Sequence, residues 1–413
     1  MKIFADSATS FISERPDATN RQLAWSAFES EGLPTTSDEV WRYAPLKDLV
    51  LDRFTVVEEP HTESDTEFAA QLCSRGGLVV RVVDGYCTST GDPIDGVVVD
   101  IEQSTQSLAG LALIHRYESD TFALLNVALA PATTVIRIGA GVNVERPIIV
   151  LNVSNATSSF SRTQIELGRG ASATVVEYFE GGAEALVVPV SEYEIGDNAL
   201  LQLITYQRLN PSAWHVARTT GFLHRDSRLR QAVIGLGAHY NRSRNDAEML
   251  DSGAENELRT TFLGSGQQVH DFRTHQLHIA PRTRSTLLSK GAVADASRSV
   301  YTGLIEIEKG AKRTDARQTN HNLLLSPAAH ADSVPNLDIR ENDVMCAHAS
   351  SVGPLDELQR WYLESRGVDR ESAERLMIQG FFYEMLANLP AELAELVERD
   401  VASVLAALNV VTP

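Results

Sequence analysis

The feature that most constrains what this chain can fold into is a repeat in the spacing of apolar residues, without a repeated sequence motif. Ile or Leu residues recur at intervals of 29, 28, 28, 27, 29, 28 and 32 residues. A unit of this length cannot bury its apolar face alone, whereas stacked copies bury a continuous core. The repeat therefore predicts a solenoid of about eight turns of ~28 residues. The anchors of the repeat are Ile138, Leu167, Ile195, Leu223, Leu250, Ile279, Ile307 and Ile339.

The repeat has the periodicity of strands. Ile136 and Ile138 flank Arg137, and Ile305 and Ile307 flank Glu306, so apolar and charged residues alternate. A small or β-branched residue follows each of the first seven anchors by four positions, and a turn residue usually lies between, as in Leu167 to Ala171. We therefore predict a mainly β fold, a β-helix-like solenoid, with a β-sandwich of coincidental spacing as the alternative.

The segments on either side of the repeat have helical patterns. We predict a helical and mixed domain at residues 1–130, a β-helix core at 131–350 and a helical domain at 351–413. The first domain should contain short strands at 77–84 and 96–101 and a helix through Leu111, Leu124 and Ala128. The last should contain three helices, the third running from Pro390 to Leu408. Such flanks would cover the unpaired strand edges of a solenoid.

Composition excludes several classes of protein. A formal net charge of −19 over 413 residues argues against sequence-independent binding of nucleic acid, which needs a basic surface. Three scattered cysteines are too few for a disulfide framework and favour a reducing compartment. No run approaches the ~18 apolar residues that a membrane span requires. We expect a cytoplasmic globular protein.

Cys346 and His348 are the candidate site residues. They lie seven and nine residues after the anchor Ile339, at the end of the repeat. Inward positions elsewhere have even offsets, as at Ala173 and Leu201, so this parity predicts that Cys346 and His348 share an outward face. A thiolate and an imidazole suit zinc, iron or an iron–sulfur cluster, but two ligands do not complete a site. A structural cysteine beside a surface histidine is the competing interpretation.

Other metal-capable or aromatic groups carry less weight. His270 and His278 share a strand parity that His275 does not, so structural or surface roles are favoured for them. Trp41 and Tyr43 are interpreted as packing residues. The chain contains no P-loop, G-x-S-x-G, H-E-x-x-H or C-x-x-C motif, so it lacks the signatures of an ATP site, an acyl-transfer triad or a closed zinc site.

Several segments together resemble the SufB/SufD family of the SUF iron–sulfur cluster assembly system, and the likeness spans most of the chain. It is strongest in a C-terminal block that contains Cys346 and His348 and continues to Gly367. The segments are Leu33-Pro34, Asp38-Glu39, Trp41-Arg42-Tyr43, Phe122 to Ala128, Ile136 to Ile138, Arg146-Pro147-Ile148, Arg313-Thr314-Asp315, Gln318 to Leu324, Gly353 to Glu357, Tyr362-Leu363 and Ser365-Arg366-Gly367.

The resemblance implies a right-handed parallel β-helix flanked by helical domains. It also implies a complex with a SufC-type ABC ATPase, and pairing of the β-helix with a SufB-type scaffold subunit or, in isolation, with a second copy. The SufB branch carries a cluster-holding cysteine where this chain aligns Asn320, which favours the SufD branch. His348 matches the SufD histidine at the subunit interface, with Cys346 beside it. The implied ATPase contact comprises Leu355, Asp356, Glu357, Leu358, Trp361, Tyr362 and Arg366.

The function that the resemblance implies is a non-catalytic scaffold subunit of the SufBCD complex. It would hold an iron–sulfur cluster transiently at the SufB interface, while ATP hydrolysis takes place on the partner. Two alternatives stay open: a β-helix carbohydrate-active enzyme, which would use acidic clusters on the solenoid flank, and a structural adaptor that binds no metal.

Overall fold

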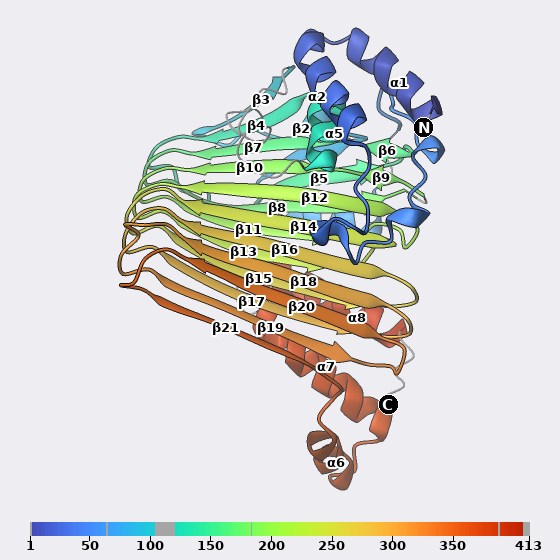
Figure 1. Ribbon diagram of the computed structural model, residues 1–413, viewed down its shortest axis with the longest axis vertical. Coiled ribbons are helices and arrows are strands. Elements are labelled where there is room, and N and C mark those ends of the chain that lie inside the picture. The colour runs from blue at the N-terminus through green and yellow to red at the C-terminus, as the bar shows by residue number, and fades with distance from the viewer. Residues whose placement is uncertain (1, 63–64, 104–119, 183, 387–388, 408–413) are drawn as a thin grey trace.

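The computed structural model describes residues 2–62, 65–103, 120–182, 184–386 and 389–407, and its core is a two-sheet solenoid (Figure 1). Each of eight turns contributes one strand to each sheet, from β4 and β5 in the first turn to β20 and β21 in the last. Consecutive turns pair in parallel. The predicted mainly β solenoid of about eight turns is confirmed.

The strands form a 10-stranded and an 11-stranded sheet. The first sheet contains, in spatial order, β2 (Tyr86–Thr90), β1 (Leu78–Val83), β5 (Ile148–Ser154), β8 (Ser172–Gly181), β11 (Leu200–Gln207), β13 (Arg228–Gly235), β15 (Glu255–Gly264), β17 (Arg284–Val293), β19 (Asp315–Leu324) and β21 (Met345–Gly353). The second contains β20 (His330–Ile339), β18 (Arg298–Ile307), β16 (Val269–His278), β14 (Tyr240–Met249), β12 (Trp214–Leu223), β10 (Val190–Ile195), β7 (Arg162–Leu167), β4 (Thr133–Ile138) and β3 (Val97–Glu102), with β6 (Ser158–Ser159) and β9 (Leu186–Val187) beside them.

Six of the eight predicted anchors occupy equivalent places in the ladder. The parallel register of the second sheet aligns Leu223 with Met249, Met249 with His278, and His278 with Ile307. The true anchors of the fifth and sixth turns are therefore Met249 and His278, and the predicted Leu250 and Ile279 were each one residue late. Both true anchors are fully buried, whereas Ile279 is 37% exposed.

The tight turns between the two sheets use the left-handed backbone region. Gly170 has φ of 69° and Asn198 has φ of 58° at equivalent turns. Glycine adopts this conformation without a steric penalty, and asparagine tolerates it because its short side chain can bond locally. These residues explain why the chain reverses after each anchor.

Helices cover the two outer faces of the solenoid rather than its ends. The helices are α1 (Lys2–Ser13), α2 (Ala18–Glu31), η1 (Glu39–Trp41), η2 (Leu46–Asp48), η3 (Leu51–Arg53), α3 (Glu67–Arg75), α5 (Thr121–Leu129), α6 (Glu357–Ser365), α7 (Arg370–Leu386) and α8 (Ala391–Ala407). The N-terminal helices and α5 share one apolar cluster with Leu186, Trp214 and Tyr240 of the second sheet. The helices α3, α7 and α8 share another with Tyr178 and Tyr206 of the first.

The predicted flanking elements are confirmed in outline. The strands expected at 77–84 and 96–101 are β1 and β3, and α5 contains Leu124 and Ala128, while Leu111 lies outside the described residues. The third C-terminal helix is α8, and Leu408 likewise lies outside the described residues. The helix α6 buries none of its own residues and projects beyond the solenoid (Figure 1).

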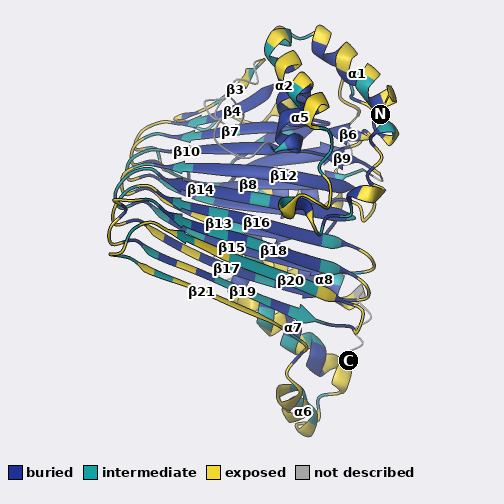
Figure 2. Ribbon diagram, in the orientation of Figure 1, coloured by how far each residue is buried: buried dark blue, intermediate teal, exposed yellow. Residues whose placement is uncertain are grey.

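Burial of the strands differs between the two ends of the solenoid (Figure 2). The interior of the first turns is apolar and includes Val80, Ile136, Ile165 and Leu201. In the last turn, most residues of β20 and β21 are exposed or half-buried. The fold therefore presents one uncovered end, and the candidate site lies there.

Candidate functional site at the open end of the solenoid

Within the described part of the chain, both sheets finish with an unpaired strand edge at the same end of the molecule. β20 is the last strand of the 11-stranded sheet, and β21 is the last strand of the 10-stranded sheet. An unpaired edge presents free backbone N–H and C=O groups that can pair with another chain. We refer to β20 and β21 together as the open end. Its two free edges make it suited to pairing with a second solenoid.

Cys346 and His348 lie on the inward face of β21, so the predicted outward orientation was wrong. The register aligns Cys346 with Ala316 and His348 with Gln318, and both partners on β19 are buried. Cys346 also packs against the interior cluster of Ile305 and Ile307. The two side chains continue the interior columns of the solenoid and are accessible only because no further turn follows.

A change of turn length explains this error. In the early turns the first inward residue of the facing sheet comes six residues after the anchor, as from Leu223 to Leu229. From Met249 onward the distance is odd: it is seven from Met249 to Asn256 and nine from Ile307 to Ala316. One added residue inverts the parity, because side chains alternate strictly along a strand. Cys346, seven residues after its anchor, is therefore inward.

The environment of the pair is that of an incomplete metal site. Neither Cys346 nor His348 makes a side-chain hydrogen bond or ion pair within the described ranges, and no group of three or more His, Cys, Asp or Glu suited to a metal occurs there. Burial, followed by the nearby charge of Asp315, raises the pKa of the Cys346 thiol. The thiol is therefore held protonated, and a metal would have to displace that proton.

Polar side chains line the interior just beneath the pair. Asn320 donates from Nδ2 to Ser333 Oγ at 2.9 Å, and Ser350 Oγ donates to the same oxygen at 2.8 Å, which links the two sheets across the last turns. Gln318 is 1% exposed, and neither of its amide atoms has a hydrogen-bond partner among the residues that the structure describes. Gln318 belongs to a segment that carries the family resemblance, but it was not predicted as a site residue.

Apolar anchors become exposed at the open end. Leu337 and Ile339 of β20 align with the fully buried Ile305 and Ile307 of the preceding turn, yet are 38% and 42% exposed. Val352 of β21 is exposed as well. An exposed row of former core positions indicates a surface that another protein covers.

The residues predicted to contact the ATPase cluster around α6. Leu358 and Trp361 are 77% and 68% exposed, and Tyr362 is also exposed. The carboxylate of Asp356 caps the helix by accepting from the backbone N–H of Leu358 and Gln359. Arg366 lies over the ring of Tyr362 with 5.3 Å from its guanidinium carbon to the ring centroid.

Two members of the predicted contact set differ in environment from the rest. Leu355 is buried in the apolar cluster of α7 and α8, so it anchors the segment and does not offer a contact surface. Glu357 is exposed on the first turn of α6, with one oxygen 3.8 Å from the guanidinium of Arg360. The exposed apolar surface is therefore formed by Leu358, Trp361 and Tyr362.

The remaining histidines have structural environments. His270 and His278 are fully buried in the interior, and burial lowers the pKa of each to about 3. His275 lies on the opposite face of the same strand, 3.0 Å from a Glu306 oxygen. The predicted parity of these three residues is confirmed.

Carboxylates on the outer face of the second sheet are engaged in ion pairs. Asp246 pairs with Arg218 and Arg244, and Asp271 pairs with Arg242 and Arg273. A carbohydrate-active enzyme needs a carboxylate pair free to transfer protons. These aspartates do not offer one.

Comparison with known proteins connects this fold to one family. The profile described as "SUF system FeS cluster assembly, SufBD core domain" matches residues 149–381. The iron–sulfur cluster assembly protein SufD of Escherichia coli is 28% identical over 372 residues, which covers 87% of this chain and 86% of that protein. The protein of the same name from Bacillus subtilis is 31% identical over 288 residues, covering 67% and 66%.

Proposed function

Because the chain belongs to the SufB/SufD family of the SUF iron–sulfur cluster assembly system, we propose that it is the SufD-like subunit of a SufBCD complex. In this proposal the chain is a scaffold without a catalytic centre, and the iron–sulfur cluster is its cargo. ATP hydrolysis takes place on a SufC-type partner. The observation that carries the proposal is the open end, where two free strand edges surround an incomplete pair of metal ligands.

The open end is the proposed contact with a SufB-type subunit. Edge strands of two solenoids can pair through their backbone groups, which gives affinity, while side chains of alternate residues set the partner. Leu337, Ile339 and Val352 would then be covered as their equivalents in earlier turns are. In the absence of that partner, the same edges would pair with a second copy of this chain.

Cys346 and His348 would face the partner across this contact. The two side chains supply a sulfur and an imidazole nitrogen, which suit iron. Partner residues would supply the missing ligands, so a cluster could be held only in the complex. Since the thiol of Cys346 is held protonated, cluster binding would release a proton.

The exposed surface of α6 is the proposed contact with the ATPase. β21 ends at Gly353 and α6 begins at Glu357, so only three residues separate the helix from the strand that carries the candidate ligands. Leu355, within this connection, is anchored in the cluster of α7 and α8. Nucleotide-driven closure of the ATPase would move α6 and thereby alter the position of β21.

Reconstitution of the complex tests this function. The chain is co-expressed with SufB-type and SufC-type subunits, purified, and loaded anaerobically with iron and sulfide. His348→Ala should leave complex assembly intact but abolish most of the cluster absorbance. His330→Ala is the matched control, because His330 is also an exposed histidine of the last turn.

Three results would contradict parts of the proposal. Failure of the wild-type chain to co-purify with either subunit would contradict the complex. Equal cluster yields from His348→Ala and wild type would contradict the site. If Cys346→Ser and His348→Ala together still give full cluster yield in the assembled complex, the chain is an adaptor that binds no metal.

A further inference from the structure

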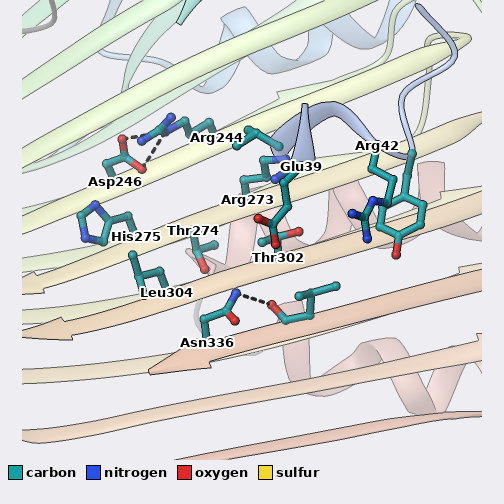
Figure 3. A pocket seen from close by; sticks show the side chains of 13 residues that line it. Glu39, Arg42, Arg244, Asp246, Arg273, Thr274, His275, Thr302, Leu304 and Asn336 are labelled. Carbon is teal, nitrogen blue, oxygen red and sulfur yellow. Dashed lines mark hydrogen bonds and ion pairs between the residues drawn. The ribbon is translucent and has the colours of Figure 1, made fainter. Parts of the chain in front are cut away.

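A cavity of about 590 Å³ lies on the outer face of the second sheet, on the opposite side of β20 from the interior. Its floor consists of residues from β14, β16, β18 and β20, and its roof is η1 with the following Arg42 and Tyr43 (Figure 3). Ligand pockets usually have volumes of about 300–1,000 Å³. The cavity is therefore of a size that accepts a small organic molecule.

Guanidinium groups dominate the polar lining of this cavity. Arg42, Arg244 and Arg273 are opposed by two carboxylates, those of Glu39 and Asp246. The lining thus has a net positive charge within a chain whose formal charge is −19. Such a local excess attracts anions.

The carboxylates next to Arg244 and Arg273 are each shared with a further arginine. Asp246 accepts from Arg244 Nε at 2.9 Å and from Arg218 at 3.2 Å. Asp271, outside the cavity, accepts from Arg242 at 2.7 Å and from Tyr240 OH at 2.9 Å. Each of these two carboxylates is therefore shared by two guanidinium groups.

Arg273 directs unused donors into the cavity. Its contacts with Asp271, at 3.2 and 3.5 Å, both come from Nε. Its two terminal nitrogens meet no acceptor among the described residues, although the residue is only 8% exposed. Burial, with the nearby charge of Arg242, lowers the pKa of Arg273, so an anion here would offset an existing electrostatic cost.

Other groups around the cavity are also unused. Across the described ranges, the side chains of Arg42, Glu39 and Thr302 have no hydrogen-bond partner. Arg42 is exposed at the rim and is positioned between two aromatic neighbours that are fixed by cation–π contacts, Trp41 over Arg242 and Tyr43 over Arg298. Leu304 and Val334 add an apolar wall.

We propose that this cavity binds a small organic oxyanion, a carboxylate or a phosphate monoester that carries a hydroxyl group. The oxyanion lies against Arg273 and Arg42, in the paired geometry that guanidinium groups favour. The hydroxyl donates to Glu39, and the carbon skeleton rests on Leu304 and Val334. Glu39 provides selectivity, because its carboxylate repels an anion that has no hydroxyl group to donate a hydrogen bond to it.

Isothermal titration calorimetry of the full chain tests the proposal with three probes. Glycerate represents a hydroxylated carboxylate, glycerol phosphate a hydroxylated phosphate, and inorganic phosphate a bare anion. We expect saturable binding of glycerate or glycerol phosphate, and whichever binds more tightly identifies the oxyanion. Arg42→Gln should weaken that binding about tenfold or more, since a charged hydrogen bond contributes roughly 1.5–3 kcal/mol.

Two further variants separate the roles of the lining residues. Glu39→Gln should weaken the hydroxylated probe yet strengthen inorganic phosphate, which a general loss of structure would not produce. Arg228→Gln is the matched control, because Arg228 is an exposed arginine of the other sheet. Arg273→Gln is measured alongside thermal unfolding, since a buried arginine also supports the fold.

The proposal is overturned by any of three results. The first is absence of saturable binding of both hydroxylated probes at millimolar concentration. The second is unchanged binding in Arg42→Gln, an exposed substitution that should not disturb folding. The third is an equal loss in Arg228→Gln. Because the readout is binding by the isolated chain, it is independent of the cluster assembly and partner contacts proposed above.

Discussion

The first and last turns of the solenoid have equivalent residues in opposite environments. Ile136 and Ile138 of β4 are 0% and 2% exposed, whereas Leu337 and Ile339 of β20 are 38% and 42% exposed. The difference comes from β3 and neighbouring segments, since Ile94, Val99 and Val142 pack against the interior cluster of the first turns. β3 runs antiparallel to β4 and places Val99 opposite Ile136, while nothing in the described ranges occupies the corresponding position beyond β20.

This contrast shows that exposure at the open end follows from where the solenoid stops. These positions carry apolar residues at both ends. The side chains of the last turn are therefore suited to burial, and they are exposed because no described residue packs over them. At the first turn the chain provides the cover itself. At the last turn, in our proposal, another subunit provides it.

The largest expected effect is a difference in stability between two matched truncations. Ile138→Ala should lower the free energy of unfolding by about 2–5 kcal/mol, because it leaves a cavity in a packed interior. Ile339→Ala should lower it by less than about 1 kcal/mol in the isolated chain, because the side chain is already half exposed. Urea unfolding followed by circular dichroism measures both. Equal losses of unfolding free energy in the two variants would contradict the proposed difference between the two ends.

Acidification should destabilise the fold through its buried histidines. Burial lowers the pKa of His270 to about 3 and of His215 to about 4, from an unperturbed 6.5. Below about pH 6.5 the unfolded chain therefore binds protons that the folded chain does not, so stability falls as the pH drops toward 4. Each such group contributes up to about 1.4 kcal/mol per pH unit.

The measurement is the free energy of unfolding from pH 7 down to pH 5. His270→Gln should reduce the slope of stability against pH, since glutamine does not titrate. A slope in His270→Gln equal to that of the wild type would contradict this assignment.

A charge at the open end should break its association with a partner. Ile339→Lys places an ammonium group in the exposed inward column, a device that blunts free strand edges. We expect at least about a tenfold loss of affinity for a SufB-type subunit, or of self-association in its absence. Ile279→Lys is the control, because Ile279 has similar exposure but lies away from the end.

Analytical ultracentrifugation measures this loss. If Ile339→Lys assembles as tightly as Ile279→Lys, the open end is not the contact surface. If both variants lose association equally, the effect is one of charge and not of position.

The smallest expected effect concerns the Cys346 thiol. Its raised pKa, caused by burial and the Asp315 charge, should make alkylation by iodoacetamide at pH 8 slower than that of a free cysteine peptide. Partner binding should slow it further by covering the open end. Mass spectrometry of the labelled peptide gives the rate, and alkylation as fast as that of the free peptide would show that the site is more open than its burial indicates.

Much of the fold could be predicted from the sequence, because repeating turns encode their own local pattern. The ~28-residue period and the alternation around Ile138 and Ile307 were sufficient to predict the number of turns and the strand type. The error at Met249 and His278 has a physical origin. Register is determined by hydrogen bonding between turns, and a buried Met or His can occupy a place where an aliphatic anchor was expected.

The candidate site was predicted only in part. The alternation of side chains along a strand was sufficient to predict that Cys346 and His348 share one face of a strand at the end of the repeat. That this face is inward became clear only from the folded turns, because the distance from the anchor to the first inward residue changes from even to odd at Met249. The burial of Leu355 and the closure of a cavity by η1 over Arg273 likewise appear only in the folded chain. Both depend on contacts between segments far apart in the chain, which a local pattern does not contain.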